Sequence, residues 1–219
     1  SENYLTYKSK IGEGDLTVLA GYSYQQTKRD RFSAGATDFS SQSVSFFNLG
    51  AGTALASSSG FSENELQSQF GRLNYDYDDK YLFTATIRRD GSSAFGDENV
   101  YGYFPSAAFG WKVSNEKFLK DSDVVSNLKL RASYGVTGNQ AVGAYETFDE
   151  ISTQLGISGG EEVVGVVPEK AGNEQLKWES SYQTNIGFDL SLLDNKITLT
   201  ADYYNIDTED LLLDNLLIP

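Results

Sequence analysis

The sequence of 219 residues contains no cysteine, no histidine and no methionine, and only three prolines. Without cysteine the chain can form no disulfide, no thiol nucleophile and no cysteine-based metal site. Without histidine it lacks the commonest metal ligand of proteins and the usual general base near neutral pH. The common catalytic triads are therefore excluded. Paired carboxylates of the glycosidase type remain possible by residue type alone, but no pattern localises such a pair. We predict no enzyme activity, no cofactor and no metal site.

Long apolar runs and an excess of positive charge are also missing. No apolar stretch approaches the roughly 18 residues of a transmembrane helix. Strands of membrane barrels escape such a search, because every second residue in them is polar. The net charge is −14, from 31 acidic and 17 basic residues. Nucleic-acid binding requires a basic stripe, so nucleic acid is not an expected partner.

The clearest pattern in the chain is a two-residue alternation on both sides of the polar turn 78–80. Apolar residues share one face before and after this turn: Leu73, Tyr75, Tyr77, Tyr81, Phe83, Ala85 and Ile87. Two such runs joined by a tight polar turn predict a β-hairpin. Each arm has about ten residues, whereas strands of soluble domains average roughly 5–6 and a tilted membrane strand needs about 9–11. We therefore predict a membrane hairpin, with tyrosines at one interface.

The same alternation recurs along the whole chain. Further strands are expected at about 1–9, 16–24, 101–113, 127–138, 178–192 and 197–204. The apolar faces of these runs carry no charge. The opposite faces carry Arg72, Asp76, Arg88, Asp90, Lys112, Lys129, Arg131, Glu179, Asp189 and Asp202. The fold class expected is all-β, as about eight strands of an antiparallel transmembrane β-barrel.

The connections between the predicted strands alternate in length. Short turns are expected at 10–15, 78–80 and 193–196, with a medium connection at 114–126. Longer loops are expected at about 26–63, 91–100 and 139–176. Outer-membrane barrels have short periplasmic turns and long extracellular loops, so we expect the longer loops to be extracellular. A soluble two-sheet sandwich with one solvated face gives the same alternation and is the alternative fold.

Several sequence motifs between about residues 70 and 215 follow one another in a fixed order. They are DKYLFTATIRRDGSS at 79–93 with FG at 95–96, FPS at 104–106, GWKVSNEKFL at 110–119, LKLRASYGVTGNQ at 128–140, LKWE at 176–179, ADYY at 201–204 and DLLL at 210–213. In order and spacing they resemble the SusC-like TonB-dependent transporters of the Bacteroidetes outer membrane. Residues 1–69 carry no motif that adds to this resemblance.

The resemblance implies a protein larger than this chain. Such transporters have a large plugged barrel of about 22 strands, an N-terminal plug domain and a segment that contacts the TonB complex. We expect this chain to be an internal part of the barrel without the plug. Because open sheet edges do not occur in lipid, it must pair with the rest of the same barrel and plug.

The resemblance also implies a location, partners and a cargo. The location is the Gram-negative outer membrane, in contact with its lipid. The partners are a SusD-like surface lipoprotein that acts as a lid and the TonB complex, reached through the absent N-terminal part. The cargo is a large nutrient, either a glycan oligosaccharide or a peptide, imported actively without any bond being made or broken.

Three charged residues are the candidate contact residues for cargo or plug. Arg88, Asp90 and Arg131 face the barrel lumen on the predicted register. The alternative, which the sequence favours, is that they are wall residues paired with one another or with the plug. Two other functions remain open, a soluble β-sandwich ligand-binding module of a secreted protein and a passive porin.

Overall fold

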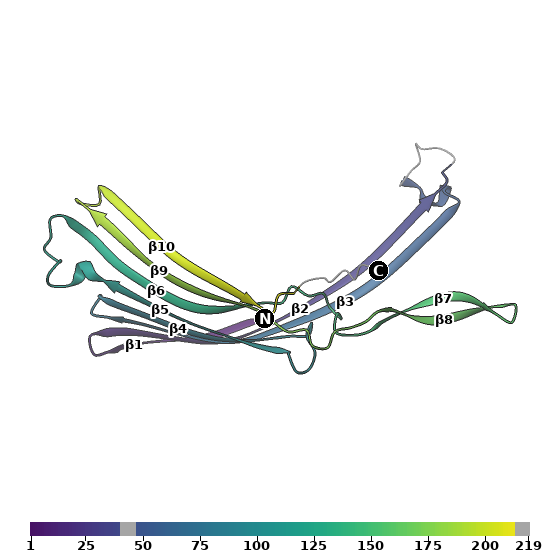
Figure 1. Cartoon of the computed structure of the whole chain (residues 1–219), viewed down its shortest axis with the longest axis horizontal. Coiled ribbons are helices and arrows are strands. Elements are labelled where there is room, and N and C mark those ends of the chain that lie inside the picture. Colours follow the sequence, from purple (N-terminus) through teal and green to yellow (C-terminus); the bar gives the residue numbers. More distant parts are fainter. Residues whose placement is uncertain (40–46, 213–219) are drawn as a thin grey trace. The chain divides into compact units, whose positions relative to one another are not determined.

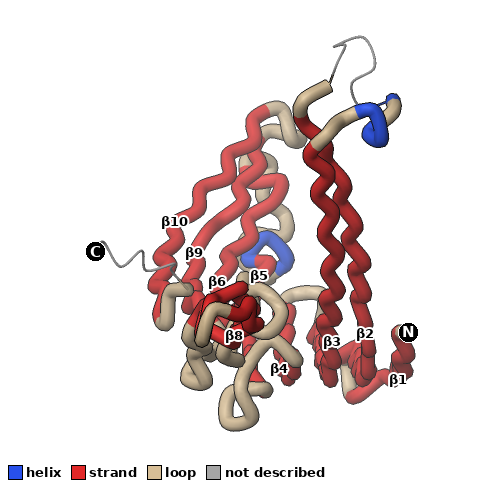
Figure 2. The backbone as a smooth tube through the Cα atoms, turned by 90° about the vertical axis from the view of Figure 1, so that its right-hand side faces the viewer, coloured by secondary structure: helices blue, strands red, loops and turns tan. Residues whose placement is uncertain are grey.

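The computed structural model describes residues 1–39 and 47–212, and nearly all of its regular structure is β-strand. Eight strands form one sheet in the order β1-β2-β3-β4-β5-β6-β9-β10 (Figures 1 and 2). Their bounds are β1 Glu2–Ile11, β2 Gly14–Thr37, β3 Ala54–Tyr77, β4 Tyr81–Ser92, β5 Tyr101–Lys112, β6 Val125–Asn139, β9 Glu179–Leu192 and β10 Ile197–Glu209. The predicted all-β class and the antiparallel sheet of about eight strands are confirmed.

The remaining elements are small. Strands β7 (Glu150–Ser158) and β8 (Glu161–Lys170) form a separate two-stranded sheet. Two 3-10 turns, η2 (Leu49–Ala51) and η3 (Val113–Asn115), lie in connections. Within the described ranges, no helix has the length and apolar character needed to cross a membrane.

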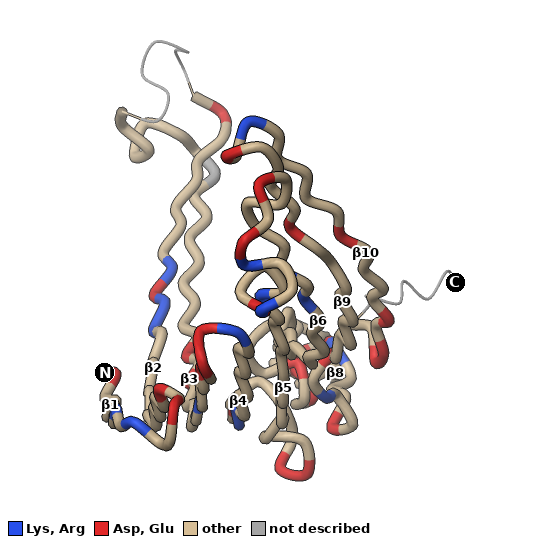
Figure 3. Tube along the Cα trace, turned by 90° about the vertical axis from the view of Figure 1, so that its left-hand side faces the viewer, with Lys and Arg blue, Asp and Glu red and all other residues tan. Residues whose placement is uncertain are grey.

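The chain divides into two compact units. The first comprises Ser1–Gln25 and Leu66–Pro219, and the second comprises Gln26–Glu65. The second unit is a hairpin made from the continuations of β2 and β3, in which Lys28 Nζ lies 3.2 Å from Glu63 Oε1. Figure 3 marks the charged run of β2 to which Lys28 belongs.

The ranges 26–63 and 139–176 were expected as irregular loops, and this expectation is wrong for much of both. Strand β2 continues to Thr37, β3 begins at Ala54, and β7 and β8 lie within the second range. Both faces of the β2–β3 continuation carry Ser, Gly and Ala, so no apolar alternation marks it in the sequence. Such strands are held by backbone pairing and by polar side-chain contacts across the hairpin, such as Lys28 with Glu63 and Ser33 with Ser58. By contrast, the connection between β4 and β5 is short and irregular, at 93–100.

The first unit has one continuous apolar face. Residues opposite each other in an antiparallel pair share a face, and Phe83 lies opposite both Tyr75 and Phe109. Farther along the sheet, Ile186 lies opposite both Ala132 and Tyr203. The side chains on this face are exposed: the exposed fraction is 54% for Phe83, 58% for Ile186 and 68% for Tyr203. No second layer covers them in the described part of the chain, so the two-sheet sandwich is wrong.

Aromatic rings gather where the apolar face meets the short turns. Tyr77 and Tyr81 stack at 6.4 Å, Tyr81 and Trp111 at 6.3 Å, and Phe83 and Phe109 approach to 5.2 Å between ring centroids. Outer-membrane barrels carry such aromatic girdles at both interfaces. This band therefore marks one membrane boundary.

Ion pairs fix the turn beside this band. Asp78 and Asp79 have positive φ angles of 54° and 50°, a conformation that Asp tolerates better than most residues. The ammonium group of Lys112 on β5 binds the Asp79 carboxylate, and Asn115 Nδ2 donates to the Asp79 carbonyl at 2.7 Å. The hydrogen bond from Lys112 holds the pKa of Asp79 below its ordinary value. The turn thereby joins the β3–β4 hairpin to the start of the β5–β6 connection.

A small buried core lies at the other end of the strands. Phe95, Phe104 and Trp178 are 4%, 7% and 7% exposed, and their rings meet at 5.1 and 5.4 Å. Trp178 Nε1 also donates to the Val100 carbonyl at 3.2 Å. A Cβ on Gly138 would lie 2.0 Å from the Phe104 ring, so only glycine fits there. This core fastens the β4–β5 connection and the segment before β9 to the sheet.

We predict that a charge on the apolar face destabilises the barrel. Ala85→Arg, midway along β4 on that face, should lower the free energy of unfolding of the intact barrel in lipid vesicles by about 2–4 kcal/mol. The matched control is Thr84→Arg, one residue away on the opposite face, which should change it much less. Urea titration measures both. Equal losses in the two variants would contradict the assignment of the faces.

We also predict a pH dependence from the Asp79–Lys112 pair, which lies outside the membrane. Because the folded pKa of Asp79 is lowered from 3.8, its stabilisation is present above pH 3.8 and is lost as the pH falls through the lower folded value. The difference in Tm between the wild type and Asp79→Asn should therefore be present at pH 6. It should disappear at pH values below the folded pKa of Asp79, where the carboxyl group is protonated. A difference that stays constant down to those pH values would refute the assigned pair.

Candidate functional site

The face opposite the apolar one carries two clusters of paired charges, and the first is built around Arg88. Arg88 Nε donates to both carboxylate oxygens of Asp90 at 2.7 Å, and its Nη2 donates to Ser68 Oγ at 2.9 Å. Arg88 and Asp90 share a face because they are two residues apart on β4, and Ser68 on β3 lies opposite Asp90. Asp90 and Ser68 are buried, at 8% and 1% exposed. We call these three residues the Arg88 cluster.

The second cluster spans three strands. Arg131 on β6 donates from Nε and Nη2 to the two oxygens of Asp189 on β9, at 2.9 and 3.1 Å. Its Nη1 lies 3.1 Å from Asp202 Oδ1 on β10. Thr200 Oγ1 adds a hydrogen bond to Asp189 at 3.2 Å. These four residues form the Arg131 cluster, whose bidentate geometry is specific to arginine.

A glycine makes the long reach of Arg131 possible. Gly187 on β9 lies directly between Arg131 and Asp202 in the register of the three strands. A Cβ at this position would lie 2.1 Å from Asp202 Oδ1 and 2.9 Å from the carbonyl oxygen of Ala201. Because glycine has no side chain, the guanidinium group passes over β9 and meets a carboxylate two strands away.

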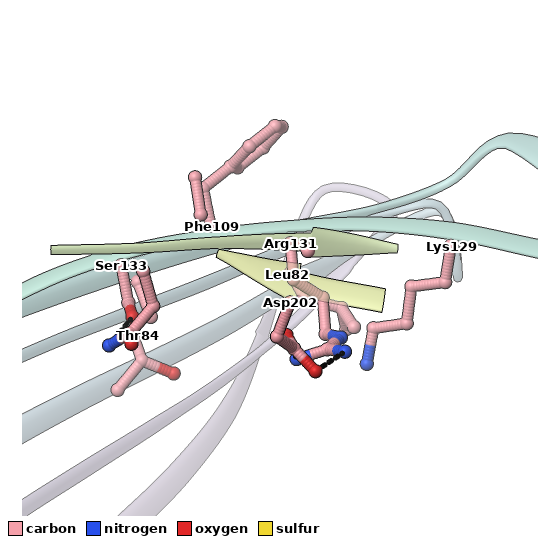
Figure 4. Close-up of a pocket in the computed structure, with 12 residues that line it drawn as sticks. Leu82, Thr84, Phe109, Lys129, Arg131, Ser133 and Asp202 are labelled. Carbon is pink, nitrogen blue, oxygen red and sulfur yellow. Dashed lines mark hydrogen bonds and ion pairs between the residues drawn. The ribbon is translucent and has the colours of Figure 1, made fainter. Parts of the chain in front are cut away.

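A pocket of about 280 Å³ lies beside the Arg131 cluster. In Figure 4 the side chains of Thr84, Lys129, Arg131, Ser133 and Asp202 extend to one side of the sheet, while Phe109 extends to the other. Asn185 Nδ2 donates to Ser133 Oγ at 3.3 Å within the same lining. The pocket thus offers charged groups of both signs together with hydroxyl and amide groups.

This arrangement suits binding rather than bond chemistry. Each carboxylate of the two clusters is engaged by an arginine, so none is held free as a general base. Within the described part of the chain, no group of three or more His, Cys, Asp or Glu residues is placed to hold a metal ion. The open donors and acceptors can bind hydroxyl groups, carboxylates or amides of a polar ligand or of another part of the protein.

The three residues proposed from the sequence fall into two separate clusters. Arg88 and Asp90 are brought together, whereas Arg131 stands apart from them with its own carboxylates. The wall pairing that the sequence left as an alternative is therefore present in the structure. The sequence missed Ser68, because no alternating pattern reached it, and Gly187, whose role depends on the register of three strands.

Comparison with known proteins shows which protein family has this architecture. The family model described as TonB dependent receptor-like, beta-barrel matches residues 2–218. TonB-dependent receptor P3 of Formosa agariphila is 47% identical over 213 residues, which are 97% of this chain and 21% of that protein. TonB-dependent receptor SusC of Bacteroides thetaiotaomicron is 39% identical over 214 residues, 95% of this chain and 21% of that protein.

Solved structures give the same result. A structure of the RagAB peptide transporter aligns with a TM-score of 0.86 and 29% identity, over 100% of this chain and 24% of that chain. The siderophore receptor PirA from Acinetobacter baumannii, at 15% identity and a TM-score of 0.54, shares the fold over 96% of this chain and 26% of that chain. The chain spans about a fifth of the length of the curated relatives, 21% of P3 and of SusC.

We predict that Gly187→Ala uncouples one half of the Arg131 cluster. The added methyl group should displace the Asp202 carboxylate and leave the Arg131–Asp189 pair in place. In the wild type, Asp202→Asn should lower the stability of the intact barrel. In the Gly187→Ala background the same change should have almost no further effect, because the contact is already lost. Additive effects of the two substitutions, measured by unfolding titration, would contradict this arrangement.

Proposed function

Because the chain belongs to the TonB dependent receptor-like, beta-barrel family, as its resemblance to SusC-like transporters predicted, we propose that it forms part of the wall of an active importer of large nutrients in the outer membrane. The observation that carries this proposal is the separation of the two faces of the sheet. One face is apolar, exposed and continuous over several strands, as lipid contact requires. The other face holds paired charges and a polar pocket, as a wet lumen requires.

The edges of the sheet indicate what else the importer contains. Strands β1 and β10 stand at the two ends of the strand order, and the described residues supply no further neighbour for either. Since unpaired backbone groups are not tolerated in hydrocarbon, both edges must pair with other strands of the same barrel. A plug domain in the lumen, the TonB complex and a SusD-like lid lipoprotein complete the proposed transporter.

The lengths of the connections support an orientation of the sheet relative to the two sides of the outer membrane. Antiparallel pairing puts the connections after β1, β3, β5 and β9 at one end of the sheet and those after β2, β4 and β6 at the other. The first end has the three tight turns, after β1, β3 and β9, together with the medium connection 113–124. We assign the end with the tight turns to the periplasm. The long β2–β3 hairpin, the connection 93–100 and the segment that carries β7 and β8 are then extracellular.

The cargo proposed is a peptide or a glycan oligosaccharide. The structurally similar RagAB is a peptide transporter and a peptide importer, which supports a peptide. The pocket beside Arg131 offers charges of both signs and hydroxyl groups, which can bind peptide termini or sugar hydroxyls. We propose that Arg88, Asp90 and Arg131 contact the cargo or the plug. Since each is already paired within the wall, none becomes an uncompensated charge when the ligand leaves.

A passive porin is the rival function, and two measurements separate it from the importer. In planar bilayers the intact barrel should conduct little, and uptake of labelled peptide or oligosaccharide by cells should require TonB. Arg131→Gln should lower cargo affinity about tenfold, the effect of one charge-assisted hydrogen bond. The control Lys196→Gln removes a charge in the β9–β10 turn and should leave uptake unchanged. Steady conductance with TonB-independent uptake would establish the porin instead.

A further inference from the structure

Arg89 is a cation on the lipid-facing side of the first unit. Arg89 lies two residues beyond Ile87 on β4 and therefore shares its face, opposite Gln69 on β3 and Tyr103 on β5. Its guanidinium carbon lies 3.7 Å from the ring centroid of Tyr101 and 5.8 Å from that of Tyr103. Its neighbour Arg88 extends to the opposite face. Arg89 is thus a charge on the exterior, held between two tyrosine rings.

The height of Arg89 puts it at a membrane interface. It is eight residues beyond Tyr81, which belongs to the aromatic band beside the short turns. At about 3.4 Å per residue along a strand tilted by about 40°, this corresponds to roughly 20 Å along the barrel axis, near the top of an apolar band about 25 Å tall. Arg89 therefore lies where headgroups of the outer leaflet begin.

Arg89 has no counter-charge within the described part of the chain. Its one hydrogen bond runs from Nη1 to Gln69 Oε1 at 3.3 Å, and its buried Nε has no acceptor. Arg88 and Arg131, by contrast, each bind a carboxylate at 2.7 and 2.9 Å. A cation near hydrocarbon is stable only when it is paired or reaches water. Arg89 thus differs from Arg88 and Arg131 in having no carboxylate of the described residues beside it.

The surroundings of Arg89 are ordered by hydrogen bonds. Gln67 Nε2 donates to the Tyr101 hydroxyl at 2.6 Å, and the Tyr22 hydroxyl approaches Gln67 Oε1 at 3.5 Å. A Cβ on Gly91 would lie 2.5 Å from the Tyr101 ring. The ring therefore lies across β4 where that strand has no side chain. This fixes the aromatic surface on which the guanidinium group rests and leaves its remaining N–H donors uncommitted.

We propose that Arg89, Tyr101 and Tyr103 form a site for the phosphate of an anionic lipid headgroup in the outer leaflet. A guanidinium group binds phosphate through two parallel hydrogen bonds, and the tyrosine rings keep the side chain at headgroup height. This inference rests on the lipid-facing assignment of the apolar face and on the periplasmic assignment of the tight turns, and not on the cargo. Failure of the import experiments would therefore leave it standing.

Native mass spectrometry of the intact barrel in detergent tests this site. The probes are phosphatidylglycerol, phosphatidylcholine and inorganic phosphate, each added at increasing concentration. The wild type should retain phosphatidylglycerol about tenfold more tightly than phosphatidylcholine, because the choline cation beside the phosphate of phosphatidylcholine weakens its attraction to the guanidinium group. Arg89→Gln should abolish this preference. Arg89→Lys, which keeps the charge but loses the planar fork, should keep part of it.

The matched control is Arg72→Gln, which removes the same charge from β3 on the opposite face and should leave the preference unchanged. Folding of each variant is checked by its heat-dependent mobility in detergent gels. If Arg89→Gln does not fold, Arg89→Lys decides the question, because full wild-type preference in that variant would overturn the bidentate site. Equal lipid preference in the wild type and Arg89→Gln would overturn it as well. Displacement of the lipid by inorganic phosphate at equal concentration would show a free-anion site instead.

Discussion

Backbone hydrogen bonding in hydrocarbon is the constraint on which this structure depends. Each unpaired N–H or C=O in lipid costs several kcal/mol, so every strand must be paired along its whole membrane length. The apolar pattern and the tight turns set the register of this pairing, and the register decides which side chains share a face. In the observed register Phe83 meets Phe109, and Arg131 meets Gly187. Lipid contact, lumen chemistry and the position of the turns all follow from this pairing.

Three arginines illustrate how the same side chain acquires different roles from its position on the sheet. Arg88 and Arg131 lie on the face opposite the apolar one and are bound by carboxylates of the same sheet. Arg89 follows Arg88 directly but lies on the apolar face, where its guanidinium group packs on the ring of Tyr101. A shift of β4 by one residue would exchange the environments of Arg88 and Arg89. The two neighbouring arginines therefore help to specify the register as well as function.

The sequence predicted the strands wherever one face meets an apolar environment. The alternation from Tyr81 to Ile87 could be read directly, because hydrocarbon selects every second side chain. The same rule fails for the continuations of β2 and β3, where Ser, Gly and Ala occupy both faces. Strand β7 was not predicted, although Ile151, Leu155 and Ile157 alternate there with polar or small residues. Within the candidate site, the sequence identified Arg131 and placed Asp189 and Asp202 on its face. Their grouping needed the register of β6, β9 and β10, which no single strand encodes.

The β7–β8 hairpin has a distinct consequence for how such proteins diversify. Strands β6 and β9 pair directly up to Asn139 and Glu179, so the β7–β8 hairpin between them supplies no strand to the wall. The hairpin satisfies its own backbone and turns at Gly159 and Gly160, both with positive φ angles of 62° and 90°. Residues can therefore be gained or lost there without moving any strand of the wall. Selection can remodel what this surface recognises while the membrane-embedded part is inherited intact.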